Sequence, residues 1–331
     1  MADELINESY AALGPDAILD AVESLGYLCD GHFLALNSYE NRVYQVGIDE
    51  GQPLIAKFYR PGRWSDEAII EEHQYTQALS DLEIPVIAPL ADDNGKTLHR
   101  HNDYRFALYL RRGGRAPELD DPEHLEQMGR FIARIHNLGE TRPFTHRPTL
   151  NIESFGVDSY QYLLAHGFVP QGLELAYRTL VEDLIIRVRS CYAAAGKVQN
   201  LRLHGDMHPG NVLWTDKGPH IVDFDDARMG PAIQDIWMFL SGDRQYMTAR
   251  LADFLNGYIE FREFDPKELH LLEALRTLRM MHYAAWIARR WQDPAFPQAF
   301  PWFNSGRFWD DHILALREQA ALMDEPPLVW D

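Results

Sequence analysis

Residues 201–227 read LRLHGDMHPGNVLWTDKGPHIVDFDDA. Asp206 and Asn211 belong to a polar cluster between two apolar segments, and Asp223 ends the second segment. A tight turn at residues 216–218 lies between two short predicted strands, so the chain forms a hairpin that brings Asn211 near Asp223. Carboxylate and amide oxygens are a typical partial ligand set for Mg²⁺. This stretch therefore predicts a metal site on a hairpin.

Asp206 stands outside this pair of ligands, on a loop between two predicted strands. It can orient a hydroxyl group and accept its proton, a combination typical of phosphoryl transfer, where positioning and charge neutralisation carry catalysis. Such chemistry also needs a lysine for the nucleotide phosphates, held by an acidic partner. Lys57 in the predicted strand LIAKFY meets this need, and the following helix offers Glu72, with Glu71 as the second choice.

The amino-acid composition and net charge limit the classes of protein to which this chain can belong. The 331 residues are 46% hydrophobic and 12% aromatic, enough for a sizeable globular core. The net charge of −19 argues against binding to nucleic acid or to an anionic membrane, because both need a positive surface. It leaves room for basic substrates, and for a polyanion held locally with a metal.

The sequence also shows few features of a secreted or membrane-spanning protein. It contains two cysteines, Cys29 and Cys191, too few for a disulfide framework. The start MADELINESY lacks the basic and apolar regions of a signal peptide, and no run approaches 18 apolar residues. We therefore expect a cytoplasmic protein that does not cross a membrane. No heptad seam demands a partner, so we expect a monomer.

Residues 1–110 predict a small α+β lobe. Short polar connections between the first three strands favour antiparallel hairpins. The expected strands are 32–36, 42–48, 54–59, 86–90 and 104–110, and the expected helices are 15–26 and 66–79.

The Gly- and Pro-rich stretch RRGGRAPELDDP opens with an expected hinge, residues 111–115. Residues 116–331 predict a larger, mainly helical lobe that carries the catalytic loop. The fold class is thus α+β and bilobal, with ATP expected in the cleft between the lobes. The expected elements here are a helix from 121, short strands at 201–203, 212–214 and 220–223, and helices near 233–241, 246–262, 267–291 and 311–323.

HGDMHPGN followed by VDFDDA, downstream of a strand lysine, resembles the protein-kinase-like fold in its aminoglycoside phosphotransferase and choline kinase branch. LNSYENRVYQV, IAKFYRPGRWS, IIEEHQ and HGDMHPGNVLW resemble the bacterial stress response kinase A (SrkA/RdoA) family more closely. The resemblance extends from about residue 15 to 325. It implies an ATP-dependent serine/threonine protein kinase in the stress physiology of a Gram-negative bacterium.

Carried over residue by residue, the resemblance makes Asp206 the catalytic base. Asn211 and Asp223 would bind Mg²⁺, while Lys57 would hold the ATP phosphates and Glu72 would fix that lysine.

The resemblance also implies nucleotide contacts in the small lobe. Ser38, in the first hairpin, would approach the phosphates. The adenine would lie against the hinge near Tyr109, Leu110 and Arg111. The stretch NSYENR contains no glycine, so a Gly-rich phosphate loop is missing and its role would pass to Ser38 and backbone amides.

Other residues of these motifs have structural interpretations. His204 and His208 are expected to brace the loop, and Asp235 in GPAIQDIW to support it from the following segment. Asp225 and Asp226 are more often solvated at such positions, although Asp225 could approach the metal.

Three alternative functions use similar residues. GDMHPGN superficially resembles metallophosphatase motifs, but the histidines such a site needs downstream are missing. A catalytically dead kinase fold acting as a binding module usually loses the lysine, the base or the metal ligands, and all are present here. A small-molecule kinase for choline, aminoglycosides or homoserine would use the same parts. Only the family resemblance favours serine and threonine of proteins as substrates.

Overall fold

The structure is a computed structural model that describes residue 10 and residues 13–330. The chain divides into two compact units with mixed α and β structure, as the α+β class predicts. Unit 1 includes the hairpin of the quoted stretch, whereas the sequence analysis assigns that hairpin to the helical lobe. The two units are thus not the same as the two predicted lobes, and the lobe bounds at residues 110 and 116 stay a prediction. Unit 1 comprises the chain up to Pro117 with Phe144–Arg147 and Gly210–Asp226; unit 2 comprises Glu118–Pro143, Pro148–Pro209 and the chain from Ala227.

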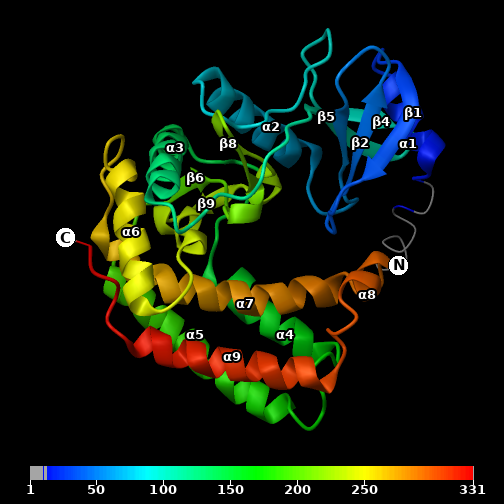
Figure 1. The fold of residues 1–331 in the computed structure, drawn as a ribbon. Coiled ribbons are helices and arrows are strands. Elements are labelled where there is room, and N and C mark those ends of the chain that lie inside the picture. The colour runs from blue at the N-terminus through cyan, green and yellow to red at the C-terminus, as the bar shows by residue number, and fades with distance from the viewer. Residues whose placement is uncertain (1–9, 11–12, 331) are drawn as a thin grey trace. The chain divides into compact units, whose positions relative to one another are not determined.

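Unit 1 is built on an antiparallel sheet of order β1-β2-β3-β5-β4. Lys57 sits in the central strand, opposite Val43 on one side and Ala107 on the other. A lysine in this position is fixed by two neighbouring strands, so its Cα cannot shift independently. Figure 1 labels most of these strands. They are β1 Cys29–Ala35, β2 Arg42–Ile48, β3 Leu54–Phe58, β4 His99–His101 and β5 Tyr104–Leu110.

Two helices accompany the sheet, α1 (Pro15–Glu23) and α2 (Asp66–Asp81). Pro15 occupies the first helical position of α1, where its missing N–H costs nothing. Ser65 caps α2 by accepting a hydrogen bond from the Ala68 N–H at 3.2 Å. Apolar residues of α1, among them Ile18, pack into one core with β2, β3 and β5.

The predicted strand 86–90 is wrong. This segment makes only isolated bridges, from Val86 to Ile221 and from Pro89 to Tyr109, and β4 forms the sheet edge instead. A proline that cannot donate to a ladder limits such a run to brief pairing.

The predicted hairpin is present in unit 1 as β7 (Val212–Thr215) and β8 (Gly218–Ile221). Ile221 bonds through both main-chain groups to the segment before β4, donating to Pro85 O at 2.7 Å and accepting from Ile87 N at 3.0 Å. These bonds fix the strand end that leads to Asp223.

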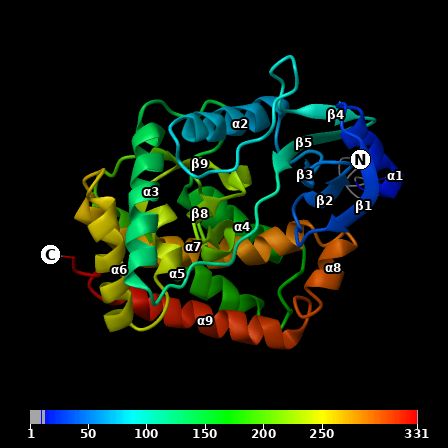
Figure 2. The same ribbon diagram turned by 45° about the horizontal axis from the view of Figure 1, so that its top comes forward.

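Unit 2 is mainly helical. Helices α3 and α6 lie side by side in both views (Figure 1, Figure 2). Glycines allow their close approach, because a Cβ on Gly129 would come within 2.1 Å of the Phe254 carbonyl oxygen. The α-helices are α3 Pro122–Glu140, α4 Asp158–Ala165, α5 Glu174–Ala195, α6 Arg244–Tyr258, α7 Leu272–Arg289, α8 Ala295–Ala299 and α9 Gly306–Asp324.

Two short strands, β6 (Leu201–Leu203) and β9 (Arg228–Gly230), pair in unit 2, and β6 leads into the loop of Asp206. The predicted helix 233–241 is wrong: it is two 3₁₀ turns, Ala232–Asp235 and Trp237–Phe239. The predicted helix 267–291 begins with a 3₁₀ stretch, Pro266–Leu271, before α7. Within the described residues, no helix has the length and hydropathy needed to cross a bilayer.

Candidate active site

Lys57 is buried in β3 and pairs with two carboxylates of unit 1. Its Nζ lies 2.9 Å from Asp223 Oδ1 and 3.4 Å from Asp225 Oδ1. Burial alone would lower the pKa of Lys57, but Asp223 and Asp225 hold that pKa well above its usual value. Lys57 therefore carries a permanent positive charge beside the end of the hairpin.

Asp223 follows β8 with a φ of 62°, in the left-handed region that few residues other than glycine, asparagine and aspartate adopt. This conformation turns the chain sharply, and the side chain is 55% exposed. The main chain of Asn211 is alongside, because the Val222 N–H donates to the Asn211 carbonyl at 3.0 Å. The hairpin thus brings an amide and an accessible carboxylate to the same end of two strands.

This donor set fits a divalent cation such as Mg²⁺, which prefers a few oxygen ligands and shares its coordination with water and phosphate. The described part of the chain holds no group of three or more His, Cys, Asp or Glu side chains arranged for a metal. A cation here would therefore depend on Asn211, Asp223 and oxygens from a phosphate substrate.

Asp225 is buried, and the expectation that it is solvated is wrong. Arg63 Nη1 donates to Asp225 Oδ2, and Arg63 Nη2 donates to Asp226 Oδ1 at 2.9 Å. Burial alone would raise the pKa of Asp225, but Arg63 and Lys57 hold it below its usual value. Arg147 also donates to the Asp225 carbonyl, which anchors the main chain after Asp223.

Glu71 and Glu72 have separate surroundings. Glu71 accepts hydrogen bonds from three consecutive backbone N–H groups of residues 145–147, at 2.6, 2.8 and 3.1 Å, so its carboxylate is already engaged. Glu72 is buried, and burial raises its pKa to about 7, while Lys57 opposes that rise. The structure has no direct Lys57–Glu72 ion pair, because Asp223 and Asp225 take the ammonium group.

Ser38 lies in the connection between β1 and β2. Its Oγ donates to the Asn41 carbonyl at 3.0 Å. The hydroxyl therefore helps to close the turn, and no other observation assigns it to a phosphate.

Tyr109, Leu110 and Arg111 lie at the end of β5. The Tyr109 hydroxyl is 3.0 Å from the Tyr59 hydroxyl, which lies 2.7 Å from His73 Nε2. The Tyr109 side chain is therefore hydrogen-bonded inside unit 1. Leu110 is 41% exposed, and Arg111 Nε donates to Gln45 Oε1 at 3.0 Å.

The loop of Asp206 is held in unit 2 by Asp235. This fully buried carboxylate accepts backbone hydrogen bonds from His204 and Gly205, each at 2.8 Å. His204 Nδ1 in turn accepts from the Asp206 N–H at 3.3 Å. Gly205 has a φ of 84°, so the loop needs a glycine there. Asp235 and His204 thus brace the loop as predicted.

The Asp206 carboxylate has two basic neighbours. Arg279 of α7 donates from Nη1 to Asp206 Oδ1, and His208 Nε2 lies 3.7 Å from Asp206 Oδ2. The side chain of Asp206 is 23% exposed, so part of it is accessible to solvent.

Comparison with known proteins shows the family of this chain. The sequence matches the phosphotransferase enzyme family (APH) over residues 32–272. Stress response kinase A of Escherichia coli (strain K12) is 42% identical over 320 residues, which is 97% of this chain and 96% of the relative. Serine/threonine protein kinase RdoA of Salmonella typhimurium has the same identity and coverage. The chain belongs to the stress response kinase A family.

Solved structures show that this family shares a wider fold. An amicoumacin kinase in complex with AMP-PNP, Ca²⁺ and Ami superposes with a TM-score of 0.72 at 19% identity, covering 95% of this chain and 96% of that one. A microcompartment-associated aminopropanol kinase has a TM-score of 0.70 at 18% identity, covering 92% and 96%. The predicted protein-kinase-like fold is therefore confirmed, and this stress response kinase A family member is a phosphotransferase.

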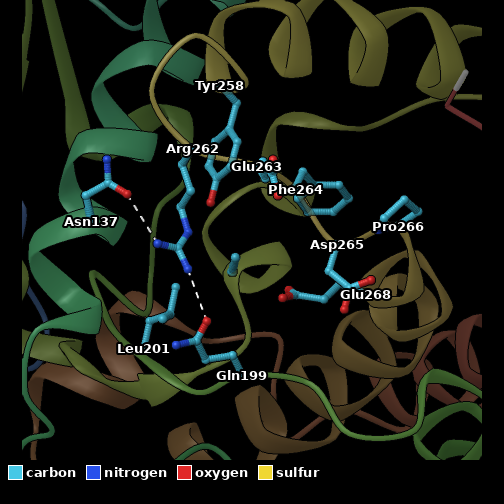
Figure 3. A pocket seen from close by; sticks show the side chains of 11 residues that line it. Asn137, Gln199, Leu201, Tyr258, Arg262, Glu263, Phe264, Asp265, Pro266 and Glu268 are labelled. Carbon is cyan, nitrogen blue, oxygen red and sulfur yellow. Dashed lines mark hydrogen bonds between the residues drawn. The ribbon is translucent and has the colours of Figure 1, made fainter.

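A separate cavity of about 640 Å³ lies in unit 2 of this family member (Figure 3). Arg262 projects into it and donates to Asn137 Oδ1 and Gln199 Oε1, each at 3.2 Å. Glu268, also in its lining, accepts from the Ile233 N–H at 2.8 Å, two residues before Asp235. One residue of the cavity lining, Glu268, thus binds the segment that contains Asp235, but none of the predicted site residues lines the cavity.

Sequence reasoning gave no role to Arg63, Arg147 or Arg279 in this kinase family member. Arg63 belongs to IAKFYRPGRWS, a stretch that supports the family resemblance, yet its partner Asp225 is 162 residues away. Arg279 belongs to a helix that reads as core with a basic rim. No local pattern distinguishes an arginine of such a rim from one that binds a distant aspartate.

Proposed function

We propose that this chain is an ATP- and Mg²⁺-dependent serine/threonine protein kinase of the bacterial stress response. The observation that carries the proposal is the buried Lys57 held against Asp223, with Asn211 on the same hairpin end. A fixed cation, an exposed carboxylate and an amide together suit a triphosphate and its metal.

In this proposal Lys57 binds the ATP phosphates. Asn211 and Asp223 hold Mg²⁺, which supplies neutralisation of phosphate charge when bound. Glu72 adds negative charge near Lys57 and favours its ammonium form, consistent with the electrostatic effect of each on the other. Ser38 lies toward the phosphates, and the main chain of residues 109–111 bonds the adenine edge.

Asp206 is proposed as the base. Its carboxylate orients the serine or threonine hydroxyl and accepts its proton. The hydroxyl oxygen forms a bond to the γ-phosphorus while the bond to the bridging oxygen breaks, and ADP leaves. Asp235 keeps the loop rigid through its two backbone hydrogen bonds, which fits a mechanism that depends on positioning.

The relative named serine/threonine protein kinase RdoA supports a protein substrate, and the relatives named stress response kinase A support a role in the stress response. The amicoumacin and aminopropanol kinases share only the fold, at under 20% identity. A small-molecule kinase is therefore the second candidate.

The test is transfer from γ-labelled ATP with Mg²⁺, comparing the wild type with Asp206→Asn. Each enzyme receives dialysed cell protein in one reaction and the small-molecule fraction in another. Label on serine or threonine, with the wild type alone, is the expected result. Label only in metabolites would replace the protein-kinase proposal with the second candidate. ATP binding without transfer to either fraction would favour a binding module.

A further inference from the structure

The cavity of unit 2 has the size of a small-molecule site. Its volume of about 640 Å³ falls within the range of about 300–1,000 Å³ that is usual for such sites. Helices α3 and α6, strand β6 and the loop after α6 contribute to its wall (Figure 3). All of these segments belong to unit 2, so the cavity lies within a single compact unit.

The lining carries more acidic than basic charge. Its carboxylates are Glu263, Asp265 and Glu268, and its basic residue is Arg262. Glu140 accepts a hydrogen bond from Arg262 Nη1 and neutralises this arginine. In the part of the chain that the structure describes, no basic side chain forms an ion pair with any of the three lining carboxylates. The cavity therefore has a negative charge that no ion pair of its lining balances.

Glu268 is the buried carboxylate of the cavity. Its side chain extends toward the interior of the cavity (Figure 3), and the residue is 5% exposed. Burial raises the pKa of Glu268 to about 7; Asp265 acts in the same direction and Arg262 opposes it. A buried carboxyl group of this kind favours a ligand with a positive charge, because an opposite charge at short range stabilises its ionised form.

The lining suits an organic cation better than a metal ion. Within residue 10 and residues 13–330, no three His, Cys, Asp or Glu side chains are arranged to hold a metal. Apolar side chains form part of the wall and can pack against an aliphatic chain. They are Leu201, Ala232, Phe264 and Pro266. Glu263 and Asp265 are exposed whereas Glu268 is buried, so carboxylates at two depths can pair with two ammonium groups of one chain.

Two hydrogen-bonded connections lead from the lining to Asp235. In the first, Glu268 accepts from the Ile233 N–H at 2.8 Å, in the same 3₁₀ turn as Asp235. In the second, the Tyr258 hydroxyl lies 2.8 Å from His136 Nδ1, and His136 Nε2 lies 3.4 Å from Asp235 Oδ2. The lining is thus connected to the carboxylate that holds two backbone N–H groups of the Asp206 loop.

We propose that this cavity binds an aliphatic polyamine, whose ammonium groups pair with Glu268 and with the exposed carboxylates of the lining. The bound amine stabilises the loop of Asp206 through Asp235. An ammonium group on Glu268 keeps this carboxylate ionised, and an ionised acceptor holds the Ile233 N–H more strongly. The 3₁₀ turn then opens less often, so Asp235 keeps its two backbone hydrogen bonds to the loop.

Calorimetric titration with spermidine tests the site, and octanediol serves as an uncharged chain of similar length. The wild type should bind spermidine and should not bind octanediol. Glu268→Gln should weaken spermidine binding at least about tenfold, because the amide keeps the shape of the side chain but lacks its charge. The control is Glu260→Gln, which removes the same charge from a side chain that is 46% exposed and outside the lining. It should keep the wild-type affinity.

A second variant decides the question if Glu268→Gln does not fold. Glu263→Gln/Asp265→Asn changes two exposed residues, and asparagine keeps the bond that Asp265 accepts from the Lys267 N–H. This variant should unfold at the wild-type temperature and should bind spermidine about three- to tenfold more weakly. Wild-type affinity for spermidine in this variant would contradict the pairing with the exposed carboxylates.

Backbone hydrogen exchange with and without spermidine measures the effect on the loop. The amides of His204 and Gly205 should exchange more slowly when spermidine is bound to the wild type. No spermidine binding by the wild type, or equal binding by Glu268→Gln, would overturn the site. Binding without slower exchange at these two amides would overturn the effect on the loop. No transfer assay enters these measurements, so their failure is distinct from a failure of the protein-kinase proposal.

Discussion

Lys57 and Asp223 form an ion pair of 2.9 Å although 166 residues separate them in the chain. One partner is fixed in the centre of a sheet, and the other lies at the sharp turn after a hairpin strand. The pair therefore joins the two parts of unit 1 that the proposed reaction needs together, the cation for the phosphates and the carboxylate for the metal.

Asp223→Asn should weaken Mg²⁺-dependent ATP binding while keeping the fold of the turn. Asparagine tolerates the left-handed conformation of this position but lacks the charge that binds the metal. We expect at least about a tenfold loss of ATP affinity in the presence of Mg²⁺. Calorimetric titration with and without Mg²⁺ measures it. ATP affinity equal to that of the wild type would exclude Asp223 as a metal ligand.

Asp206→Asn should behave in the opposite way. The variant should bind ATP with wild-type affinity, but transfer should fall about 10²- to 10⁴-fold because the amide cannot accept the hydroxyl proton. Single-turnover transfer and ATP titration on the same preparation separate the two effects. An equal loss of ATP binding in this variant and in Asp223→Asn would contradict the division of labour.

Asp235→Asn should destabilise unit 2 and disorder the Asp206 loop. One carboxylate accepts two backbone N–H groups at 2.8 Å, and an amide can accept with only one of its two ends. We expect a loss of about 3 kcal/mol in the free energy of unfolding and a fall in the transfer rate. Urea unfolding measures the first effect.

The matched control is Asp243→Asn at the start of α6, where the side chain accepts a single bond from the Tyr246 N–H at 2.9 Å. Asparagine caps a helix as well as aspartate does, so its stability should be unchanged. Equal effects of both substitutions would mean that Asp235 has no special role.

The wild type should lose stability between pH 4.5 and 7 through Glu72. Its pKa is about 7 in the folded protein, above the usual value of 4.5, so the folded state holds a proton that the unfolded state releases first. Stability from this group is present below pH 4.5 and is lost as pH rises to 7. The loss amounts to about 3 kcal/mol.

Glu72→Gln has no proton to release at this position. Urea unfolding from pH 4.5 to 8 should therefore show a flatter profile for the variant and a gain relative to the wild type at pH 8. Parallel profiles for the two proteins would show that Glu72 has an ordinary pKa in the folded state.

Arg63→Met should cost about 3–5 kcal/mol of unfolding free energy, because it leaves the buried Asp225 with less compensation. The double variant Arg63→Met/Asp225→Asn should recover part of this loss, since the unpaired charge is gone. Arg100→Met removes a pair with Asp66 in which the arginine is 60% exposed, and it should change stability by less than about 1 kcal/mol. A double-mutant cycle that shows no coupling free energy between Arg63 and Asp225 would contradict the prediction.

Local sequence signals predicted some elements well. Strands 42–48 and 104–110 have the predicted bounds, and the cap and proline signals place the starts of α1, α2 and α3. These elements follow from residues that are neighbours in the chain. The sequence predictions do not include the long helix α5, although its buried residues Tyr177, Val181, Leu184 and Val188 follow helical spacing.

Where tertiary contacts decide the conformation, the sequence was misleading. Residues 86–90 have an apolar strand composition, but hydrogen bonds to β8 and β5 hold the segment as a connection. Residues 233–241 have an apolar helical pattern, yet Glu268 binds Ile233 and Asp235 binds the Asp206 loop. These bonds favour 3₁₀ turns over a continuous helix.

The sequence by itself determined the family, the α+β class and the set of candidate residues, Lys57, Asp206, Asn211 and Asp223, because the motifs keep a fixed order and spacing along the chain. Only the tertiary structure decided the partners of these residues: Asp225 beside Lys57, Arg63 on Asp225, and Arg279 on Asp206. The physical reason is that an ion pair depends on distance in space and on burial. Residues that are 73 or 162 positions apart carry no local signal of either.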